Sequence, residues 1–420
     1  MIAVIDCNNF FVSCERVFRP ELQDKPVAVL SNNDGCFVAR SNEVKQLGIP
    51  MGAAAFEYQT QIKQHNIQLF SANFTLYGDI SHRVMTTIRE HAPETEVYSI
   101  DEAFIELSDI NKQTRIKFAE KLRADILQWV GIPVSIGIAP TKTLAKAANE
   151  RAKKDLTLNG VLDISDEEEI QQLLREISIR DVWGIGRNLN EFLHRYGIYS
   201  ALDLKNANDR LLKQQQSIVL QRTVLELKGI ACIPIAPHQP EQKTIITSRT
   251  FGTPVENKLV LQKAVAAYCS RAAEKLRKQR LRARSLSLFI RTSRFQKDDT
   301  YYYKSLTVDF PEPTSYTPVI THHAMKMIDE AYLHGYRYKQ AGITLHNLMP
   351  RDHVQQNLFS HEDHDRHDQV MQAVDKINHR WGTDSVHTAI SGTNQLWSTK
   401  QSQRSPSYTT RWDQLPQVRL

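Results

Sequence analysis

The second half of the sequence carries an ordered series of strand and helix signals that restricts the fold more than any other feature. The pattern predicts a strand, a helix, two strands, a helix and a final strand. This order is the split βαβ plan. The six predicted segments are residues 244–251, 258–280, 283–291, 301–309, 318–334 and 341–347.

The N-terminal part predicts a separate α/β core in which strands end on carboxylates. Residues 2–5 are apolar and mostly β-branched, and they stop at Asp6, as expected of a buried strand that delivers a carboxylate at its end. Residues 97–100 run in the same way into Asp101 and Glu102. Acidic side chains from two distant parts of the chain are therefore available to one site.

Further elements extend this core. Residues 134–138 predict a third strand, followed by Thr141 as a helix cap and a helix over residues 144–154. After a Gly-Ile-Gly turn, apolar residues recur at helical spacing and predict a small helical module; they are Leu189, Phe192, Leu193 and Tyr196.

Composition limits the class of protein. With 420 residues and 41% hydrophobic composition, the chain is long enough for several compact domains. No apolar stretch approaches the roughly 20 residues that span a membrane, so no membrane partner is expected. Five scattered cysteines without a C-x-x-C pair indicate reduced thiols and a cytoplasmic protein. The net charge of +6 favours an acidic partner only weakly.

Two compositional shifts divide the chain. Pro234, Pro237 and Pro240 crowd one short polar segment, which we predict to be a domain boundary. Beyond Pro350 the sequence becomes polar, Gln-rich and His-rich, which predicts a poorly ordered tail with one helix at most.

The carboxylates suggest two-metal chemistry, but their spacing leaves an alternative open. Two divalent ions roughly 3.5 to 4 Å apart can activate a hydroxyl and stabilise an in-line displacement. Adjacent strand residues point to opposite faces, so a turn or bulge is needed for Asp101 and Glu102 to reach the same ions. By spacing alone, the favoured alternative is that Asp6 caps a turn while Asp101 and Glu102 form a solvated pair.

Longer motifs favour the catalytic interpretation. Residues 6–15 and 98–104 resemble the two acidic motifs of Y-family DNA polymerases. Residues 25–36, 137–146 and 181–187 resemble further motifs of the UmuC-type members of this family, in matching order. The resemblance therefore covers nearly the whole chain.

The resemblance implies a right-hand architecture, of mixed α/β and α+β class, with a split-βαβ little finger and a flexible C-terminal tail. The implied parts are a palm (residues 1–25 and 79–163), fingers (26–78), a thumb with a helix-hairpin-helix (165–232), a little finger (243–348) and a partner-binding tail (351–420).

The same resemblance implies the catalytic residues. Asp6, Asp101, Glu102 and the backbone carbonyl of Cys7 would hold two Mg²⁺ ions, with Mn²⁺ as a substitute. Phe11 stands where the family places its steric gate, an aromatic ring that excludes a ribose 2′-hydroxyl; it could also be a core aromatic.

Nucleotide contacts would come from Phe10, Lys45 and Lys153. Many members carry Tyr and Arg where this chain has Asn42 and Lys45, which alters the grip on the triphosphate because Lys lacks the fork of Arg. Lys142 and Lys146 fit either a solvated helix face or DNA contact.

DNA contacts are implied in two places. Gly184 and Gly186 precede a helix, as in a helix-hairpin-helix that binds phosphate through backbone amides, although a lone G-x-G is more often an ordinary turn. A basic helix suited to a polyanion carries Arg271, Lys275, Arg277 and Lys278. A solvated basic helix is the alternative.

In the tail, residues 355–359 resemble the bacterial sliding-clamp pentapeptide, with Gln355, Leu358 and Phe359 as the contacts. Nearby acidic and histidine side chains predict a hydrated tail rather than a metal cluster; they are His361, Asp363, His364, Asp365, His367 and Asp368.

The implied function is low-fidelity translesion DNA synthesis in the bacterial SOS response. No segment resembles a proofreading exonuclease. Implied partners are primer-template DNA, deoxynucleoside triphosphates, the sliding clamp, a processed UmuD-type dimer and a RecA filament, which would bring the enzyme to the nucleoid. A non-catalytic clamp-bound adaptor is one alternative, and a nucleotide cyclase with a palm-like core is another.

Overall fold

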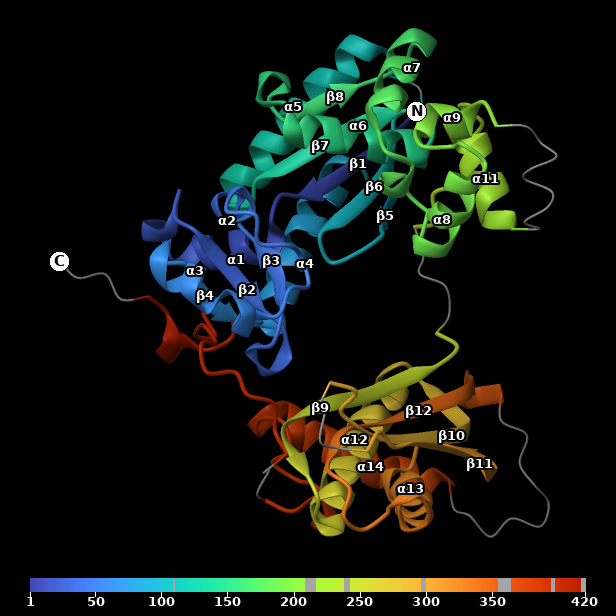
Figure 1. Ribbon diagram of the computed structural model, residues 1–420. Helices are drawn as coiled ribbons and strands as arrows, with labels where there is room; N and C mark the ends of the chain where they lie inside the picture. Colours follow the sequence, from blue (N-terminus) through green and yellow to red (C-terminus); the bar gives the residue numbers. More distant parts are fainter. Residues whose placement is uncertain are drawn as a thin grey trace. The chain divides into compact units, whose positions relative to one another are not determined.

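The computed structural model describes residues 1–108, 110–207, 217–237, 242–295, 300–353, 364–393 and 397–416 of the 420-residue chain. The chain forms two compact units (Figure 1). The first comprises Met1–Ser31, Gly35–Gln239 and Gln403–Leu420, and the second comprises Asn32–Asp34 and Pro240–Ser402. The division at residue 239 falls inside the predicted proline cluster.

A five-stranded sheet organises the first unit, and its central strand carries Asp6. The strand order is β5-β6-β1-β7-β8, with β1 antiparallel to both neighbours. The predicted strands at residues 2–5 and 134–138 are confirmed, but the strand predicted at residues 97–100 is wrong beyond Val97, because the chain bends at residues 99–101 between β5 and β6. The strands are β1 (Ile2–Cys7), β5 (Thr95–Val97), β6 (Glu102–Glu106), β7 (Val134–Ala139) and β8 (Val161–Asp163).

The two faces of this sheet are covered by different helices. Ala3, Ile5 and Cys7 of β1 pack in one core, whereas Ile2 and Val4 pack in another, as expected from the alternation along a strand. The first core contains residues of α1 (Phe10–Phe18), α4 (Phe74–His91) and α5 (Lys112–Val130), and the second contains residues of α6 (Lys142–Lys154).

Helix α6 lies unusually close to β7, and a glycine permits this. A Cβ atom on Gly137 would lie 2.3 Å from the Ala145 carbonyl oxygen and from the Asn149 nitrogen. The helix begins as predicted, because the Thr141 side chain accepts a hydrogen bond from the Leu144 amide. Close packing brings the lysines of α6 over the sheet.

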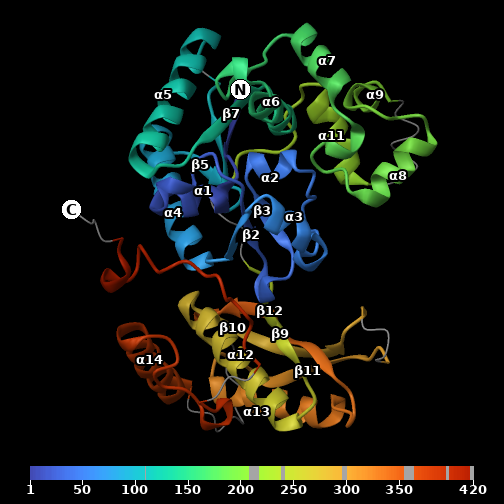
Figure 2. The same ribbon diagram turned by 60° about the vertical axis from the view of Figure 1, so that its left-hand side comes forward.

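Two smaller groups complete the first unit. A three-stranded sheet of order β3-β2-β4 lies within the predicted fingers and is formed by β2 (Val27–Leu30), β3 (Phe37–Arg40) and β4 (Gln68–Ser71), with α2 (Asn42–Gln46) and α3 (Gln59–Gln64). The predicted helical module is present (Figure 2) and contains α7 (Glu167–Glu176), α8 (Arg187–Arg195), α9 (Ala201–Lys205) and α11 (Ile218–Leu227).

The second unit has the predicted split βαβ order. Its four strands form a sheet of order β11-β10-β12-β9, and both helices pack with it in one core. The elements are β9 (Ile245–Val255), α12 (Lys258–Lys278), β10 (Leu281–Thr292), β11 (Tyr303–Thr314), α13 (Thr317–Ala331) and β12 (Tyr338–Pro350). Among the helices described in either unit, none is long and apolar enough to cross a membrane.

The segment beyond Pro350 contains the one expected helix, α14 (His364–Trp381), but it is not a hydrated tail. Asp368 is buried and accepts a hydrogen bond from Arg282, and the ring of His367 stacks on Tyr316 at 3.9 Å between ring centroids. His364 bonds to Glu312. The prediction of a hydrated tail was therefore wrong here, because paired charges and a stacked ring hold α14 against the second unit. His361 and Asp363 lie outside the described residues.

Candidate functional site

Two of the predicted metal-binding carboxylates are cross-strand neighbours. Asp6 of β1 stands directly opposite Glu102 of β6 in the antiparallel ladder. Both side chains lie on the α6 face of the sheet, because Val4 and Phe104, two residues away on the same strands, pack in that core.

Asp101 lies outside the strand, in a bend that precedes β6. Its carboxylate accepts a hydrogen bond from Ser99 Oγ at 2.5 Å, and its backbone carbonyl accepts one from the Cys7 amide at 2.9 Å. The predicted turn between Asp101 and Glu102 is therefore present, and it places the Asp101 backbone beside the end of β1.

Each cross-strand carboxylate is paired with a lysine of α6. Lys153 Nζ lies 2.9 Å from Asp6 Oδ2, and Lys146 Nζ lies 2.9 Å from Glu102 Oε2. Neither of the two roles considered for Lys146 describes this contact. The seven-residue spacing of the two lysines, which puts them on one helix face, was the signal in the sequence. Lys142 is only 1% exposed and pairs with Glu96, so it is structural.

Burial makes the ionised forms of the two facing carboxylates costly. The pKa of Asp6 is raised to about 7, chiefly by burial; the charge and hydrogen bond of Lys153 lower it, and the adjacent Glu102 raises it. Burial also disfavours the charged form of Glu102, but hydrogen bonds with Asp6 and Lys146 and the nearby lysine charges outweigh it and lower that pKa. An additional cation would relieve the cost of ionising both groups.

Neighbouring carboxylate oxygens are the donors that Mg²⁺ and Mn²⁺ prefer, so Asp6 and Glu102 suit these ions. Within the described ranges, no three His, Cys, Asp or Glu side chains are gathered closely enough to hold a metal ion. The Asp101 carboxylate accepts a hydrogen bond from Ser99 through Oδ1, and it does not form a group of three with this pair.

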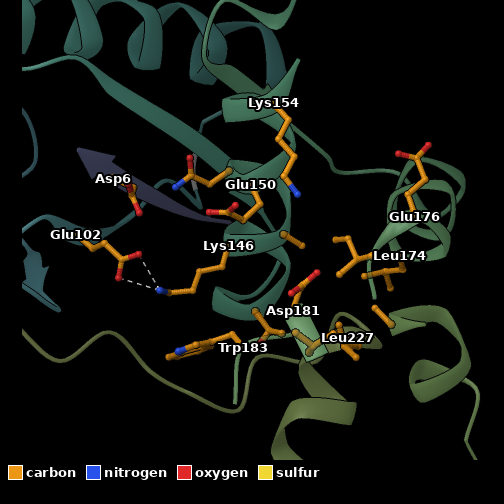
Figure 3. A pocket seen from close by; sticks show the side chains of 16 residues that line it. Asp6, Glu102, Lys146, Glu150, Lys154, Leu174, Glu176, Asp181, Trp183 and Leu227 are labelled. Atoms are coloured by element: carbon orange, nitrogen blue, oxygen red, sulfur yellow. Dashed lines mark hydrogen bonds and ion pairs between the residues drawn. The ribbon is translucent and has the colours of Figure 1, made fainter. Parts of the chain in front are cut away.

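A cavity of about 400 Å³ opens beside this pair (Figure 3). It is lined by Asp6, Glu102 and Lys146 on one side and by Trp183 and Asp181 on another. Lys146 Nζ lies 4.7 Å from the centroid of the Tyr98 ring and 5.4 Å from that of Trp183, whose Nε1 donates to the Tyr98 hydroxyl. These cation–π contacts hold the lysine in position, and no pattern in the sequence predicted them.

Three cations gather near the carboxylates. Burial lowers the pKa of Lys45, and the charges of Arg40 and Lys153 lower it further, which means that these groups lie within electrostatic reach of one another. Arg40 was not predicted. Its Nε atom is buried and has no hydrogen-bond partner among the described residues, and burial lowers its pKa. Such a cluster is suited to a polyphosphate.

The two predicted aromatic contacts differ in exposure. Phe10 is 3% exposed and belongs to the core, so any nucleotide contact by this residue would come from its backbone. Phe11 is half-buried and stacks on Tyr77, with 4.5 Å between ring centroids and an interplanar angle of 13°. Its outer surface remains open to a ligand.

The predicted basic helix is partly neutralised by the C-terminal region. Arg277 forms two hydrogen bonds of 2.7 Å with Asp375, and Arg271 pairs with Glu274 and Asp384. Both arginines therefore have protein carboxylates as partners, which the sequence did not predict, and the Arg271 side chain remains 36% exposed. Lys275 and Lys278 of the same helix are exposed.

The remaining predicted contacts are glycines and the clamp peptide. Gly184 has a φ of +90°, which favours glycine, and Gly186 precedes α8 with open space at its Cβ position. Open space at a helix start would admit a phosphate. Gln355, Leu358 and Phe359 lie outside the described residues.

Comparison with known proteins agrees with this geometry. Residues 5–150 match the impB/mucB/samB family, residues 242–358 match its C-terminal domain, and residues 368–418 match a domain of unknown function. The chain is 39% identical to protein UmuC of Salmonella typhimurium and 38% identical to protein ImpB of the same species, in both cases over 100% of each chain. It is 26% identical to DNA polymerase IV of Pelotomaculum thermopropionicum, over 93% of this chain and 95% of that one.

The fold is similar to that of solved polymerases. A Y-family DNA polymerase chimera matches 83% of this chain and 100% of its own, with a TM-score of 0.66 and 21% identity. An insertion ternary complex of Dbh DNA polymerase matches the same shares, with a TM-score of 0.54 and 22% identity. From the full-length similarity, the matching domains and the shared fold, the chain belongs to the impB/mucB/samB family and is a Y-family DNA polymerase.

Proposed function

We propose that this polymerase copies damaged DNA templates with low fidelity during the bacterial DNA damage response. The 3′-hydroxyl of a primer attacks the α-phosphate of a template-paired deoxynucleoside triphosphate, and pyrophosphate leaves. The observation that carries this proposal is the cross-strand pair of Asp6 and Glu102, held at the edge of a cavity next to a cluster of cations.

Two Mg²⁺ ions would be held by Asp6, Glu102, the Asp101 carboxylate and the Cys7 carbonyl. When bound, such ions lower the pKa of the attacking hydroxyl and stabilise the leaving oxygen. Cys7 acts through its backbone because its thiol is buried, which raises the thiol pKa well above its usual range. Lys146 and Lys153 hold Glu102 and Asp6 in place.

The cations beside this site bind the triphosphate. Positive charge comes from Arg40 of β3, Lys45 of α2 and Lys153 of α6. Many family members carry Tyr and Arg where this chain has Asn42 and Lys45. Arg40 supplies the planar guanidinium that is missing at those two positions.

DNA is held by contacts that do not read sequence. The amides at the start of α8, next to Gly184 and Gly186, bind one phosphate, and Lys275 and Lys278 bind others. The clamp-like peptide at residues 355–359 binds the sliding clamp, and a processed UmuD-type dimer and a RecA filament complete the assembly. The alternative, a non-catalytic adaptor, is disfavoured because DNA binding and partner recruitment require neither the Asp6–Glu102 pair nor the cation cluster beside it.

Primer extension on undamaged and lesion-containing templates tests the proposed function. We expect the purified protein, supplied with Mg²⁺ and with the accessory proteins named above, to extend primers past an abasic site or a pyrimidine dimer. The matched control is a high-fidelity polymerase on the same templates, which should stop before the lesion. Failure to extend any template under these conditions would reject polymerase activity, and extension of undamaged templates alone would reject the translesion role.

Phe11 should determine the choice of sugar. Replacing Phe11 with alanine removes the ring that a 2′-hydroxyl would strike, and steric overlap in a packed site costs about 1 to 3 kcal/mol. We expect the ratio of ribonucleotide to deoxynucleotide incorporation efficiency to rise roughly 10- to 100-fold. Phe56→Ala is the control, because it removes a ring of the same size that is 75% exposed, and it should leave the ratio unchanged. An unchanged ratio in the Phe11 variant would make this ring a packing residue only.

A further inference from the structure

We propose that Gln403–Tyr408, a segment we call the strap, positions the ring of Phe11 and thereby sets the discrimination between ribose and deoxyribose. The strap lies in the region that matches a domain of unknown function, and it packs on the first unit although it follows the second unit in the sequence. This inference rests on the proposed role of Phe11 as the steric gate.

The strap begins with a short strand-like contact. The Ser71 amide donates to the Gln403 carbonyl at 3.0 Å, and the Gln403 amide donates to Ser71 Oγ at 3.0 Å. Arg404 forms a parallel bridge with Ser71 at the end of β4. The strap therefore docks where the fingers sheet passes into α4.

One buried amide joins the strap to α4. Asn73 Oδ1 accepts from the Leu76 amide and caps this helix. Asn73 Nδ2 donates to Ser405 Oγ at 3.0 Å and to the Ser405 carbonyl at 3.2 Å. Because the same side chain caps α4 and binds the strap, release of the strap also loosens the start of the helix that carries Tyr77.

A buried carboxylate connects the strap to α1, the helix that carries Phe11. Glu15 of α1 is 0% exposed, and its Oε1 accepts hydrogen bonds from Ser405 Oγ at 3.1 Å and from the Tyr77 hydroxyl at 2.7 Å. Its Oε2 has no hydrogen-bond partner in the described part of the chain. A buried carboxylate with so few donors depends on each of them, so loss of Ser405 shifts Glu15 and Tyr77 together.

The final link reaches the steric gate. The Tyr77 ring stacks on Phe11, with 4.5 Å between centroids, and Glu15 lies one turn after Phe11 on α1. At the other end of the same helix, Tyr408 of the strap stacks on Phe18, with 4.6 Å between centroids. The strap thus holds α1 at both ends, and the Ser405–Glu15–Tyr77 network supports the face of Phe11 that points away from the substrate.

The Ser405→Asp substitution tests this inference, because it places a second carboxylate against Glu15 and repels the strap. Release should appear as faster hydrogen exchange of the Ser71 and Gln403 amides. We expect the ratio of ribonucleotide to deoxynucleotide incorporation efficiency to rise about three- to tenfold, the size expected from one lost hydrogen bond. A chain that ends at Ser402 removes the strap entirely and should give a rise at least as large.

Two reference variants separate the possible outcomes. Thr410→Asp adds the same charge at an exposed position beyond the strap and should leave both exchange and ratio unchanged. Phe11→Ala reports the gate itself. If Phe11→Ala raises the ratio while Ser405→Asp shows release and both strap variants keep a wild-type ratio, the positioning role of the strap is wrong. If Phe11→Ala leaves the ratio unchanged, the gate assignment fails first, and the inference fails with it.

Discussion

Replacing Glu102 with glutamine should reduce the rate of nucleotide addition by about 10³-fold or more. The amide keeps the shape of the side chain but removes the charge that faces Asp6 across the ladder, where two metal ions would be held. Loss of one such ligand removes several kcal/mol of transition-state stabilisation. The measurement is single-nucleotide incorporation on a primed template at saturating DNA, with DNA affinity determined separately by fluorescence anisotropy. DNA affinity should stay near wild type, because Glu102 contributes no positive charge.

Glu106→Gln is the matched control for this experiment. Glu106 lies on the same strand and is exposed, so the same chemical change there should leave the rate within about twofold of wild type. Lys146→Met distinguishes the effect of the Glu102 carboxylate from the effect of its ion pair, because it removes the lysine and retains Glu102. A Glu102→Gln enzyme that keeps more than a tenth of the wild-type rate would reject Glu102 as a metal ligand. An equally large loss in Lys146→Met would assign the effect to the ion pair instead.

Replacing Leu358 and Phe359 together with alanine should abolish clamp-stimulated synthesis while preserving basal activity. Two apolar side chains that fill a pocket contribute roughly 1.5 to 3 kcal/mol each, so clamp affinity should fall about 10²- to 10⁴-fold. Basal synthesis should survive because none of the residues assigned here to catalysis lies near this part of the sequence. The measurement is primer extension with and without the clamp, for wild type and variant.

A double alanine substitution at His361 and Glu362 is the control for the clamp experiment, because it changes the neighbouring tail and spares the peptide. It should respond to the clamp as wild type does. Persistence of clamp stimulation in the Leu358 and Phe359 variant would show that residues 355–359 are not the principal contact. Collapse of basal activity in the same variant would show that the peptide is structural.

Local patterns in the sequence were sufficient for the main elements. A β-branched run that stops at Asp6 predicts β1, because strand formation depends on the pattern of neighbouring residues. The βαβ order of the second unit follows in the same way from the local pattern of apolar residues. The need for a turn at Asp101 also followed from strand geometry, and the bend before β6 supplies it.

Contacts between distant segments were decided by the tertiary structure. The lysine spacing in α6 is visible in the sequence, but only the close approach permitted by Gly137 places Lys146 on Glu102 and Lys153 on Asp6. Similarly, a basic stretch predicts a polyanion surface, yet Arg277 is neutralised by Asp375, 98 residues later. The charge of a side chain predicts the kind of partner that it binds, but tertiary packing determines which residue becomes that partner.

The strand that ends at Asp6 and the succession of strands and helices in the second unit were thus determined by the sequence itself, because both depend on local periodicity. The metal-binding role of Asp6, Asp101 and Glu102 rests on the resemblance of their motifs to those of Y-family DNA polymerases and stays a prediction. The strap was decided only by the tertiary structure. Its polar composition predicts no core, but Ser405 and Tyr408 become buried when the end of the chain meets Glu15 and Phe18 near its beginning. This burial depends on contact between two segments that are distant in the sequence, so it cannot be predicted from either segment alone.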